Sequence, residues 1–399
     1  MMSGWQWWRR TSVVIALALG SSAPSCRTPE ATLGEPTASA RAEASRQAAP
    51  AEAHNVDSPD DSGEPETSPE PAASVPREPW LSPLTDAQLA ILHGSVEDQA
   101  PEHRGGVAPS VENKHYLSGN EKTLDAFFAE LDGVGGGYVG VGTDQGYLFL
   151  SWARFEVAWF IDYDPAIQQI HEIYRLLLTH ASTPEQFLAL WDEPARDEVY
   201  GLIDAAHQGV DAKRLRYWYR NAQGRIHNHL RRTRRRLVAQ GVPSYLDEQA
   251  RYDYVRRMLE LRRVRPLLVD LLADQGLAEL GRSAEALGVP LRVLYLSNAE
   301  QYWKRYSSQY RANIASLPVT DDAVVLRTIT AKDANNDYRY NMQTVANYRR
   351  WLAEPYVRRV YDVVHAGPAA RPEGVTFFRT IGEPRDSPRV RRRRAQAAG

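Results

Sequence analysis

The spacing of apolar residues along the chain predicts strands that alternate with helices. Short apolar runs of strand length occur at 138–141, 157–161, 291–296, 323–330 and 375–380. Around them, apolar residues recur every three or four positions, which predicts helices at 85–92, 122–131, 147–155, 167–178, 299–315 and 341–364. This alternation favours an α/β fold with a doubly wound, mostly parallel, Rossmann-like sheet that helices cover on both faces.

Residues 184–287 interrupt the alternation with helical periodicity alone. Segments such as FLALW, YDYVRRMLELRRV and PLLVDLLADQGLAEL carry no strand signal. We therefore expect a large helical insertion at about 184–287, inside one α/β domain that spans residues 80–384.

The first 26 residues are typical of an export signal. Arg9 and Arg10 precede a short apolar run at 13–19, and small residues then lead to Cys26, the only cysteine of the chain. Lipid attachment to Cys26 would make this an exported, membrane-anchored lipoprotein of the cell envelope. Secretion or a periplasmic location without an anchor is one alternative, and a chain that is not cleaved or not exported is another. Because Cys26 is the only cysteine, no disulfide and no cysteine-based metal site is expected in the domain.

Two further segments are predicted to be disordered from their composition. Residues 27–79 are rich in Ala, Pro, Glu and Ser, and 27–78 contain eleven acidic residues against four Arg, which is typical of a tether. Residues 385–399 include RVRRRR and are expected to form a basic tail. The formal net charge of the whole chain is −2, so no specific nucleic-acid partner is expected.

The stretch 137–165 indicates a ligand class. It predicts a strand, a turn containing Gly140 and Gly142, a helix, and a second strand that ends at Asp162, twenty residues after Gly142. In Rossmann-like units such a turn brings backbone close to a ligand, and such an acid binds ribose hydroxyls. Gln145 stands where a dinucleotide site has its third glycine, which argues against NAD or FAD. The structural alternative is a tight turn, with Asp162 and Asp164 capping the next helix.

A second motif, LRVLYLSNAEQYW, runs from a predicted strand directly into a helix. Residues just beyond the ends of parallel strands line the ligand crevice of a doubly wound sheet. This places Ser297 beside a bound ligand, Asn298 as a catalytic hydrogen-bonding group, and Glu300 as a base or cation ligand. Helix capping by Ser297 or Asn298, with Glu300 in the first turn, is the structural alternative.

A basic run lies in the insertion, in RIHNHLRRTRRR at 225–236. His227 and His229 are two positions apart, so on a helix they point to different faces and do not form a metal pair. The arginines form either a solvated face or a contact with phosphate or anionic lipid.

The GxG turn and FIDYDPAI at 160–167 resemble class I S-adenosylmethionine-dependent methyltransferases. Tyr138 and Asp144 stand where that family has an acid and a third glycine. GVGTDQ, SNAEQY and YLSGNE, at 116–121, resemble more narrowly an uncharacterised bacterial family that is often exported. The resemblance covers about 115–380 and implies a methyltransferase-like fold in which Asp144 and Gln145 are the expected residues.

These observations predict a domain that binds a small, nucleoside-like ligand, with S-adenosylmethionine as one candidate. The expected ligand contacts are Gly140, Gly142, Asp144, Gln145, Asp162 and Ser297. Two alternatives stay open: an active S-adenosylmethionine-dependent methyltransferase, and a non-catalytic module of the cell envelope that binds other proteins. Export argues against the enzyme, because S-adenosylmethionine is made in the cytoplasm.

Overall fold

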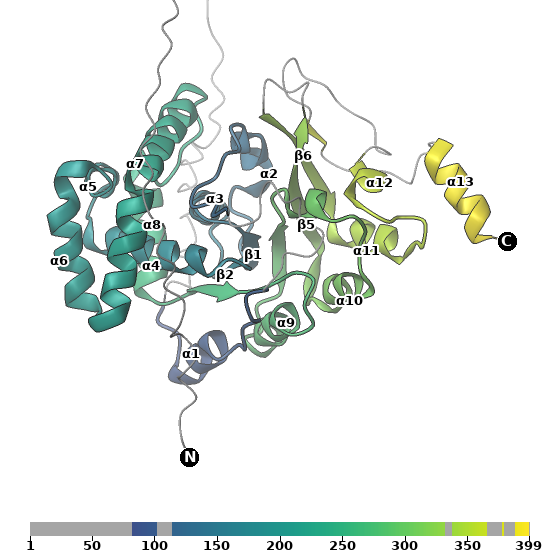
Figure 1. Ribbon diagram of the computed structural model, residues 1–399, viewed down its shortest axis with the longest axis horizontal. Helices are drawn as coiled ribbons and strands as arrows, with labels where there is room; N and C mark the ends of the chain where they lie inside the picture. The colour runs from purple at the N-terminus through teal and green to yellow at the C-terminus, as the bar shows by residue number, and fades with distance from the viewer. Residues whose placement is uncertain (1–81, 102–113, 332–336, 365–376, 379–387, 399) are drawn as a thin grey trace, which may run out of the picture. The chain divides into compact units, whose positions relative to one another are not determined.

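The computed structural model describes residues 82–101, 114–331, 337–364, 377–378 and 388–398. Seven strands form one sheet in the order β3-β2-β1-β4-β5-β6-β7 (Figure 1). The strands are β1 (Gly137–Val141), β2 (Val157–Asp162), β3 (Val264–Leu268), β4 (Leu291–Tyr295), β5 (Val319–Ala331), β6 (Asp337–Thr344) and β7 (Phe377–Phe378).

The first five strands are parallel to one another, and β6 returns antiparallel to β5. The order of β3, β2, β1, β4 and β5 is the order found in Rossmann-type sheets. The short β7 pairs in parallel with β6. The predicted α/β class, with a mostly parallel, Rossmann-like sheet, is confirmed.

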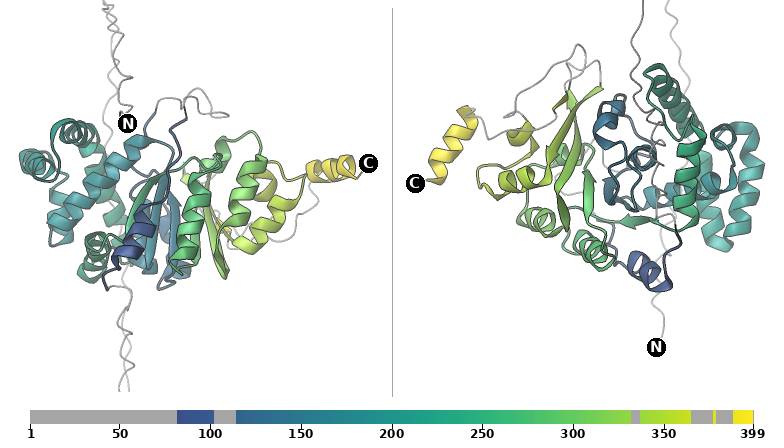
Figure 2. Two further views of the ribbon diagram at one scale, coloured as in Figure 1. Left: turned by 90° about the horizontal axis from the view of Figure 1, so that it is seen from below. Right: turned by 180° about the vertical axis from the view of Figure 1, so that it is seen from behind.

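Helices cover both faces of the sheet (Figure 2). Successive strand residues point to opposite faces, so Tyr138 joins one apolar core and Val139 the other. The helices on the Tyr138 side include α2 (Phe128–Leu131), α3 (Gln145–Ala153), α4 (Pro165–His180), α5 (Pro184–Ala189), α6 (Arg196–Ala206), α7 (Gly209–Ala239) and α8 (Gln249–Glu260). The Val139 side packs against α1 (Asp86–His93), α9 (Gly276–Ala286), α10 (Ser308–Ser316), α11 (Val345–Ala353) and α12 (Val360–Val364).

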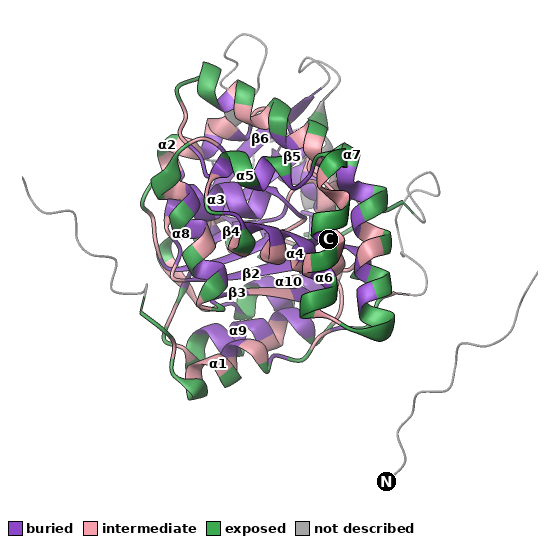
Figure 3. Cartoon of the chain, turned by 90° about the vertical axis from the view of Figure 1, so that its left-hand side faces the viewer, coloured by how far each residue is buried: buried purple, intermediate pink, exposed green. Residues whose placement is uncertain are grey.

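Three short 3-10 helices, η3 (Leu124–Phe127), η4 (Glu193–Ala195) and η5 (Ala299–Tyr302), complete the described helices together with α13 (Pro388–Ala397). Buried residues gather in the strands and on the inner sides of the helices, and exposed residues lie on the outer sides (Figure 3). This distribution is what a sheet with helices on both faces requires.

The helical insertion is shorter than predicted. Helices α5 to α8 end at Glu260, and the part expected to be helical at 264–268 is strand β3. Pro266 fits this place because β3 is the edge strand of the sheet, where a residue that donates no backbone hydrogen bond is tolerated. The helix expected at 341–364 likewise begins as strand β6, whose side chains are mostly buried.

The C-terminal segment also differs from the prediction. Where its composition suggested disorder, residues 388–397 form α13, and Arg393 Nη1 lies 2.6 Å from a carboxylate oxygen of Asp362 on α12. The predicted export signal, Cys26 and the tether all lie outside the described residues. Among the described helices, none is long and apolar enough to cross a membrane.

Candidate functional site

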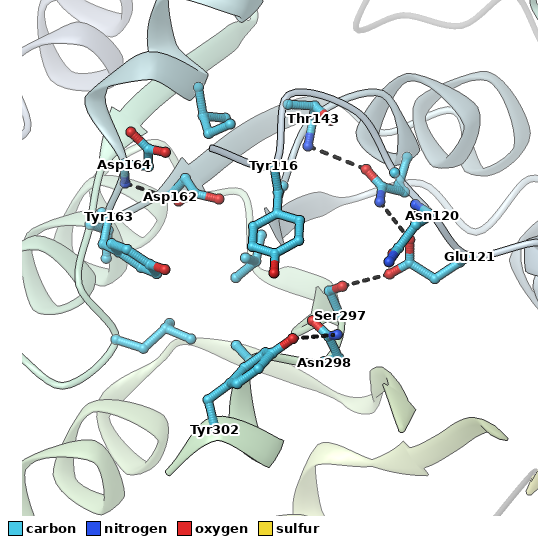
Figure 4. Close-up of a pocket in the computed structure, with 18 of the residues that line it drawn as sticks. Tyr116, Asn120, Glu121, Thr143, Asp162, Tyr163, Asp164, Ser297, Asn298 and Tyr302 are labelled. Carbon is cyan, nitrogen blue, oxygen red and sulfur yellow. Dashed lines mark hydrogen bonds between the residues drawn. The ribbon is translucent and has the colours of Figure 1, made fainter. Parts of the chain in front are cut away.

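A cavity of about 130 Å³ lies at the carboxyl ends of β1, β2 and β4 (Figure 4). Five segments line it: part of 114–121, the turn after β1, the end of β2, the loop after β3 and the residues after β4. Parallel strands bring their carboxyl ends to one edge of the sheet, so residues far apart in sequence meet there. The volume is similar to that of a cavity that admits one aromatic ring.

Five predicted site residues line this cavity, namely Gly142, Gln145, Asp162, Ser297 and Asn298. Three others do not, namely Gly140, Asp144 and Glu300. The structure therefore brings the two motifs to one place, and it gives the remaining three residues different roles.

Gly142 forms the tight turn. Its φ of +104° is unfavourable for any residue with a Cβ. The Gly142 carbonyl accepts a hydrogen bond of 3.0 Å from Nε2 of His171 on α4, and His171 Nδ1 accepts one of 3.1 Å from the Tyr147 hydroxyl. Burial lowers the pKa of His171 to about 4, so this histidine is neutral near pH 7 and holds the turn by hydrogen bonds alone.

Gly140 has a packing role in β1 and does not line the cavity. A Cβ at this position would lie 1.9 Å from the hydroxyl oxygen of Tyr138, which is fully buried two residues earlier on the same face of β1. Glycine is required here because the tyrosine ring occupies the space that a side chain would need.

Asp144 ties the turn to its surroundings. Its carboxylate lies 2.6 Å from Nε2 of His229 on α7, and it accepts hydrogen bonds from the Gly119 amide at 2.6 Å and the Thr143 hydroxyl at 3.1 Å. Burial alone would raise the pKa of Asp144, but the charge of His229 and these hydrogen bonds lower it. Asp144 is only 2 % exposed, so it joins three segments and does not contact the cavity.

Glu121 is the central acid of the site, and the sequence prediction did not select it. It is 5 % exposed and lines the cavity. Its carboxylate accepts hydrogen bonds from five neutral donors, which are Ser297 Oγ (2.6 Å), Gln145 Nε2 (2.8 Å), Tyr295 Oη (3.0 Å), Asn120 N (3.2 Å) and Thr328 Oγ1 (3.3 Å). The YLSGNE motif contains Glu121, but its partners are too far away in sequence to reveal the role.

The sequence left two roles open for Asp162 and Asp164, contact with a ligand and capping of the next helix, and the structure places the two acids differently. Asp164 caps α4, since its Oδ1 accepts from Ala166 N at 3.0 Å, and its other oxygen lies 2.7 Å from His115 Nδ1. Asp162 is half-buried, accepts a hydrogen bond from the Asp164 amide, and faces the cavity (Figure 4). Asp162 is therefore the acid at the end of β2 that faces the cavity without capping α4.

Ser297 and Asn298 occupy the turn after β4. Ser297 has a φ of +48°, a conformation that costs free energy for a residue with a side chain and recurs at functional sites. Asn298 Nδ2 donates to the Tyr302 hydroxyl at 3.3 Å, and burial raises the pKa of Tyr302. Tyr116 lies between this pair and Asp162 (Figure 4).

Glu300 is a buried structural residue, so the catalytic role predicted for it is not supported. Its carboxylate lies 2.6 Å from Nε of Arg327 on β5 and accepts hydrogen bonds from the hydroxyls of Tyr306 and Tyr348. Burial opposes the charge of Arg327, but Glu300 more than offsets this and raises the arginine pKa. This network lies outside the cavity.

The cavity lining is acidic. Four carboxylic side chains, those of Glu121, Asp162, Asp164 and Asp270, face it or border it, against one lysine, Lys114. Burial, followed by the nearby charge of Asp98, raises the pKa of Asp270. No group of three or more metal-ligating residues occurs in the described parts of the chain. The lining therefore favours a neutral or positively charged ligand over an anionic one.

Comparison with protein families matches residues 116–379 to a family described as Domain of unknown function (DUF7790). This range agrees closely with the 115–380 over which the motifs suggested an uncharacterised family, and the match carries no methyltransferase assignment. No curated protein matches the chain. Because the matched region includes the sheet, the turn after β1 and the motif after β4, the chain belongs to the DUF7790 family.

Proposed function

We propose that the domain binds a small, nucleoside-like ligand without phosphate groups in the cavity at the ends of β1, β2 and β4. One observation carries the proposal: Gly142, Asp162 and Ser297, from three strand ends, line the same cavity. In Rossmann-type folds the glycine turn lets the backbone approach the ligand closely, and an acid after the second strand binds the ribose hydroxyls. Asp162 would accept hydrogen bonds from the two ribose hydroxyls.

The charge of the lining supports a ligand without phosphate. A phosphate would meet four acidic side chains and a single lysine, and like charges at short distance in a partly buried site repel strongly. The aromatic side chains at the cavity, those of Tyr116, Tyr163, Tyr302 and Trp303, fit a flat ring. The base would fill the cavity, whose volume admits about one aromatic ring, and the sugar would extend toward solvent beside the half-buried Asp162.

The test is a thermal-shift screen of the full chain against nucleosides, nucleotides and S-adenosylmethionine. We expect nucleosides to raise the Tm and their 5′-phosphates to have a much smaller effect, because ligand binding to the folded state stabilises it. Asp162→Asn should abolish the shift while Asp321→Asn, a change at an exposed position of β5, should keep it. If no nucleoside shifts the Tm, the proposal is wrong.

A methyltransferase is the second candidate, and the acidic, aromatic lining favours it. The sulfonium of S-adenosylmethionine is a cation, and carboxylates and aromatic faces both attract cations. In that reading Asn298 would hold the group that receives the methyl. Transfer of a labelled methyl group from S-adenosylmethionine, measured with wild-type protein and with Asn298→Ala, separates this candidate from simple binding.

We also propose that the chain is exported and anchored by a lipid on Cys26. Arg9 and Arg10, the apolar run that follows and the small residues before Cys26 support this. Mass spectrometry of the mature N-terminus tests it, since cleavage at Cys26 with an added diacylglycerol is expected. A mature chain that retains residues 1–25 would contradict the proposal.

A further inference from the structure

Helix α7 presents a basic outer face that the ligand site does not use. The helix has 31 residues and contains ten Lys or Arg against one acidic residue. Its inner side is apolar and packs in the core through residues that include Leu215, Tyr219, Ile226 and Leu230. The outer side is therefore fixed in its orientation by the packing of the inner side.

Most of the outer basic residues have no acidic partner. Arg214, Arg216, Arg234 and Arg236 form ion pairs with nearby acids. Six others have no such partner among the described residues, and they are Lys213, Arg220, Arg225, Arg231, Arg232 and Arg235. All six are exposed. Spacings of four and seven positions put them along one side of the helix.

Exposed apolar side chains lie among these cations. On α7, Val210 is 71 %, Tyr217 52 % and Val238 56 % exposed, and only two other large hydrophobic residues of the described chain are comparably exposed. A helix with basic residues and an exposed tyrosine and valines on one face matches the chemistry of the boundary between water and lipid, where cations meet head groups and aromatic rings enter the interface.

We propose that the outer face of α7 docks the domain on a membrane surface that carries anionic phospholipid. Charge complementarity supports this occupant, since the six cations extend along a helix of roughly 46 Å. The predicted export signal and the lipid attachment at Cys26 favour a bilayer over a nucleic acid as the source of phosphate. The proposal does not depend on what the cavity binds.

The test measures co-sedimentation of the full chain with vesicles of phosphatidylcholine, alone or mixed with phosphatidylglycerol. The leader and any lipid on it contribute equally in both mixtures, so the difference between them reports on charge. The test variant carries Arg225→Glu, Arg232→Glu and Arg235→Glu. The control carries Arg262→Glu, Arg305→Glu and Arg358→Glu, which are exposed positions away from α7 with the same change in net charge.

We expect wild type and control to bind the anionic vesicles more tightly than the neutral ones, and to lose this preference at high salt. Each arginine near an anionic surface contributes roughly fivefold to partitioning, so the three reversals should lower it by more than about 100-fold. Arg→Gln at the same three positions should give a smaller loss of partitioning. This neutral variant replaces the charge-reversed one in the test if the charge reversal unfolds the chain.

Three outcomes overturn the proposal. The α7 variant could bind anionic vesicles as wild type does, or the control could lose as much affinity, which would make the effect one of net charge. Alternatively, wild type could show no preference for anionic vesicles but bind a short DNA duplex through the same arginines. The face would then be a nucleic-acid surface.

Discussion

The ion pair between Asp144 and His229 is the most informative contact to break, because it joins the insertion to the turn of the candidate site. His229→Ala removes the charged partner and leaves Asp144, which is 2 % exposed, with two of its three donors. Loss of one partner of a buried ion pair costs about 3–5 kcal/mol. Because two hydrogen-bond donors to Asp144 remain, we expect a loss of unfolding free energy at the lower end of this range, about 3 kcal/mol. For a domain of this size that is a fall in Tm of about 6 °C.

The pH dependence of the same contact has a defined sign. Burial lowers the pKa of His229, but Asp144 more than offsets this, so the folded-state pKa lies above the ordinary 6.5. Its stabilisation is complete below pH 6.5 and is lost as pH rises through the folded-state pKa. The pKa of Asp144 is lowered from 3.8, so its stabilisation is present above that value and is lost at lower pH.

The difference in unfolding free energy between wild type and His229→Ala should therefore be largest between about pH 4 and pH 6.5 and should shrink above that range. Chemical denaturation at several pH values measures it. The control is His227→Ala on the same helix, because His227 lies 3.7 Å from Asp192, whose side chain is 53 % exposed. Loss of this weaker pair in His227→Ala should lower the free energy of unfolding by less than about 1 kcal/mol. Equal losses for the two variants, or a difference that grows with pH, would refute the reasoning.

Four further substitutions test the buried contacts in and near the site. Gly140→Ala should destabilise the protein by about 1–3 kcal/mol in chemical denaturation, since its Cβ would meet the Tyr138 ring. Tyr138→Phe removes a buried hydroxyl without a hydrogen-bond partner and should leave the free energy of unfolding equal or higher. A large loss of stability in Tyr138→Phe would contradict the conclusion that this hydroxyl has no partner. Glu121→Gln should cost about 1–3 kcal/mol, because an amide N–H₂ would replace an acceptor that faces only donors, and an unchanged Tm would argue against that network. Glu300→Gln should lower the free energy of unfolding by about 3–5 kcal/mol, since it leaves Arg327 as a buried charge, but ligand affinity of the folded fraction should not change.

The strand–turn–helix–strand unit at 137–165 was predictable because its signals are local. Apolar runs mark β1 and β2, glycine marks the turn, and Asp162 follows at a fixed distance. Strand β3 was not predictable in this way. It is an edge strand of five residues containing Arg265 and Pro266, and its apolar residues continue a helical pattern from the preceding segment.

The parts of the site that the prediction missed depend on distant partners. Glu121 is identified by hydrogen bonds from Ser297 and Thr328, which are 176 and 207 positions away, and no spacing rule contains such contacts. Gly140 was assigned to the ligand because a glycine near the end of a strand can be required either by a ligand or by a neighbouring side chain. The competing reason, a bulky side chain two positions earlier on the same face of the strand, is visible in Tyr138 once the strand is known.

The contacts of Glu121 also determine when the cavity can exist during synthesis. The carboxylate belongs to a segment made before β1, whereas its donors on β4 and β5 are made almost two hundred residues later. A nascent chain still lacking Thr328 holds the glycine turn and Asp162 but lacks one of the five donors that position Glu121 in the cavity wall. If the domain binds a ligand as proposed, a ribosome-bound chain should reach full affinity only after β5 has emerged, which would make ligand capture a signal that the five parallel strands have been made.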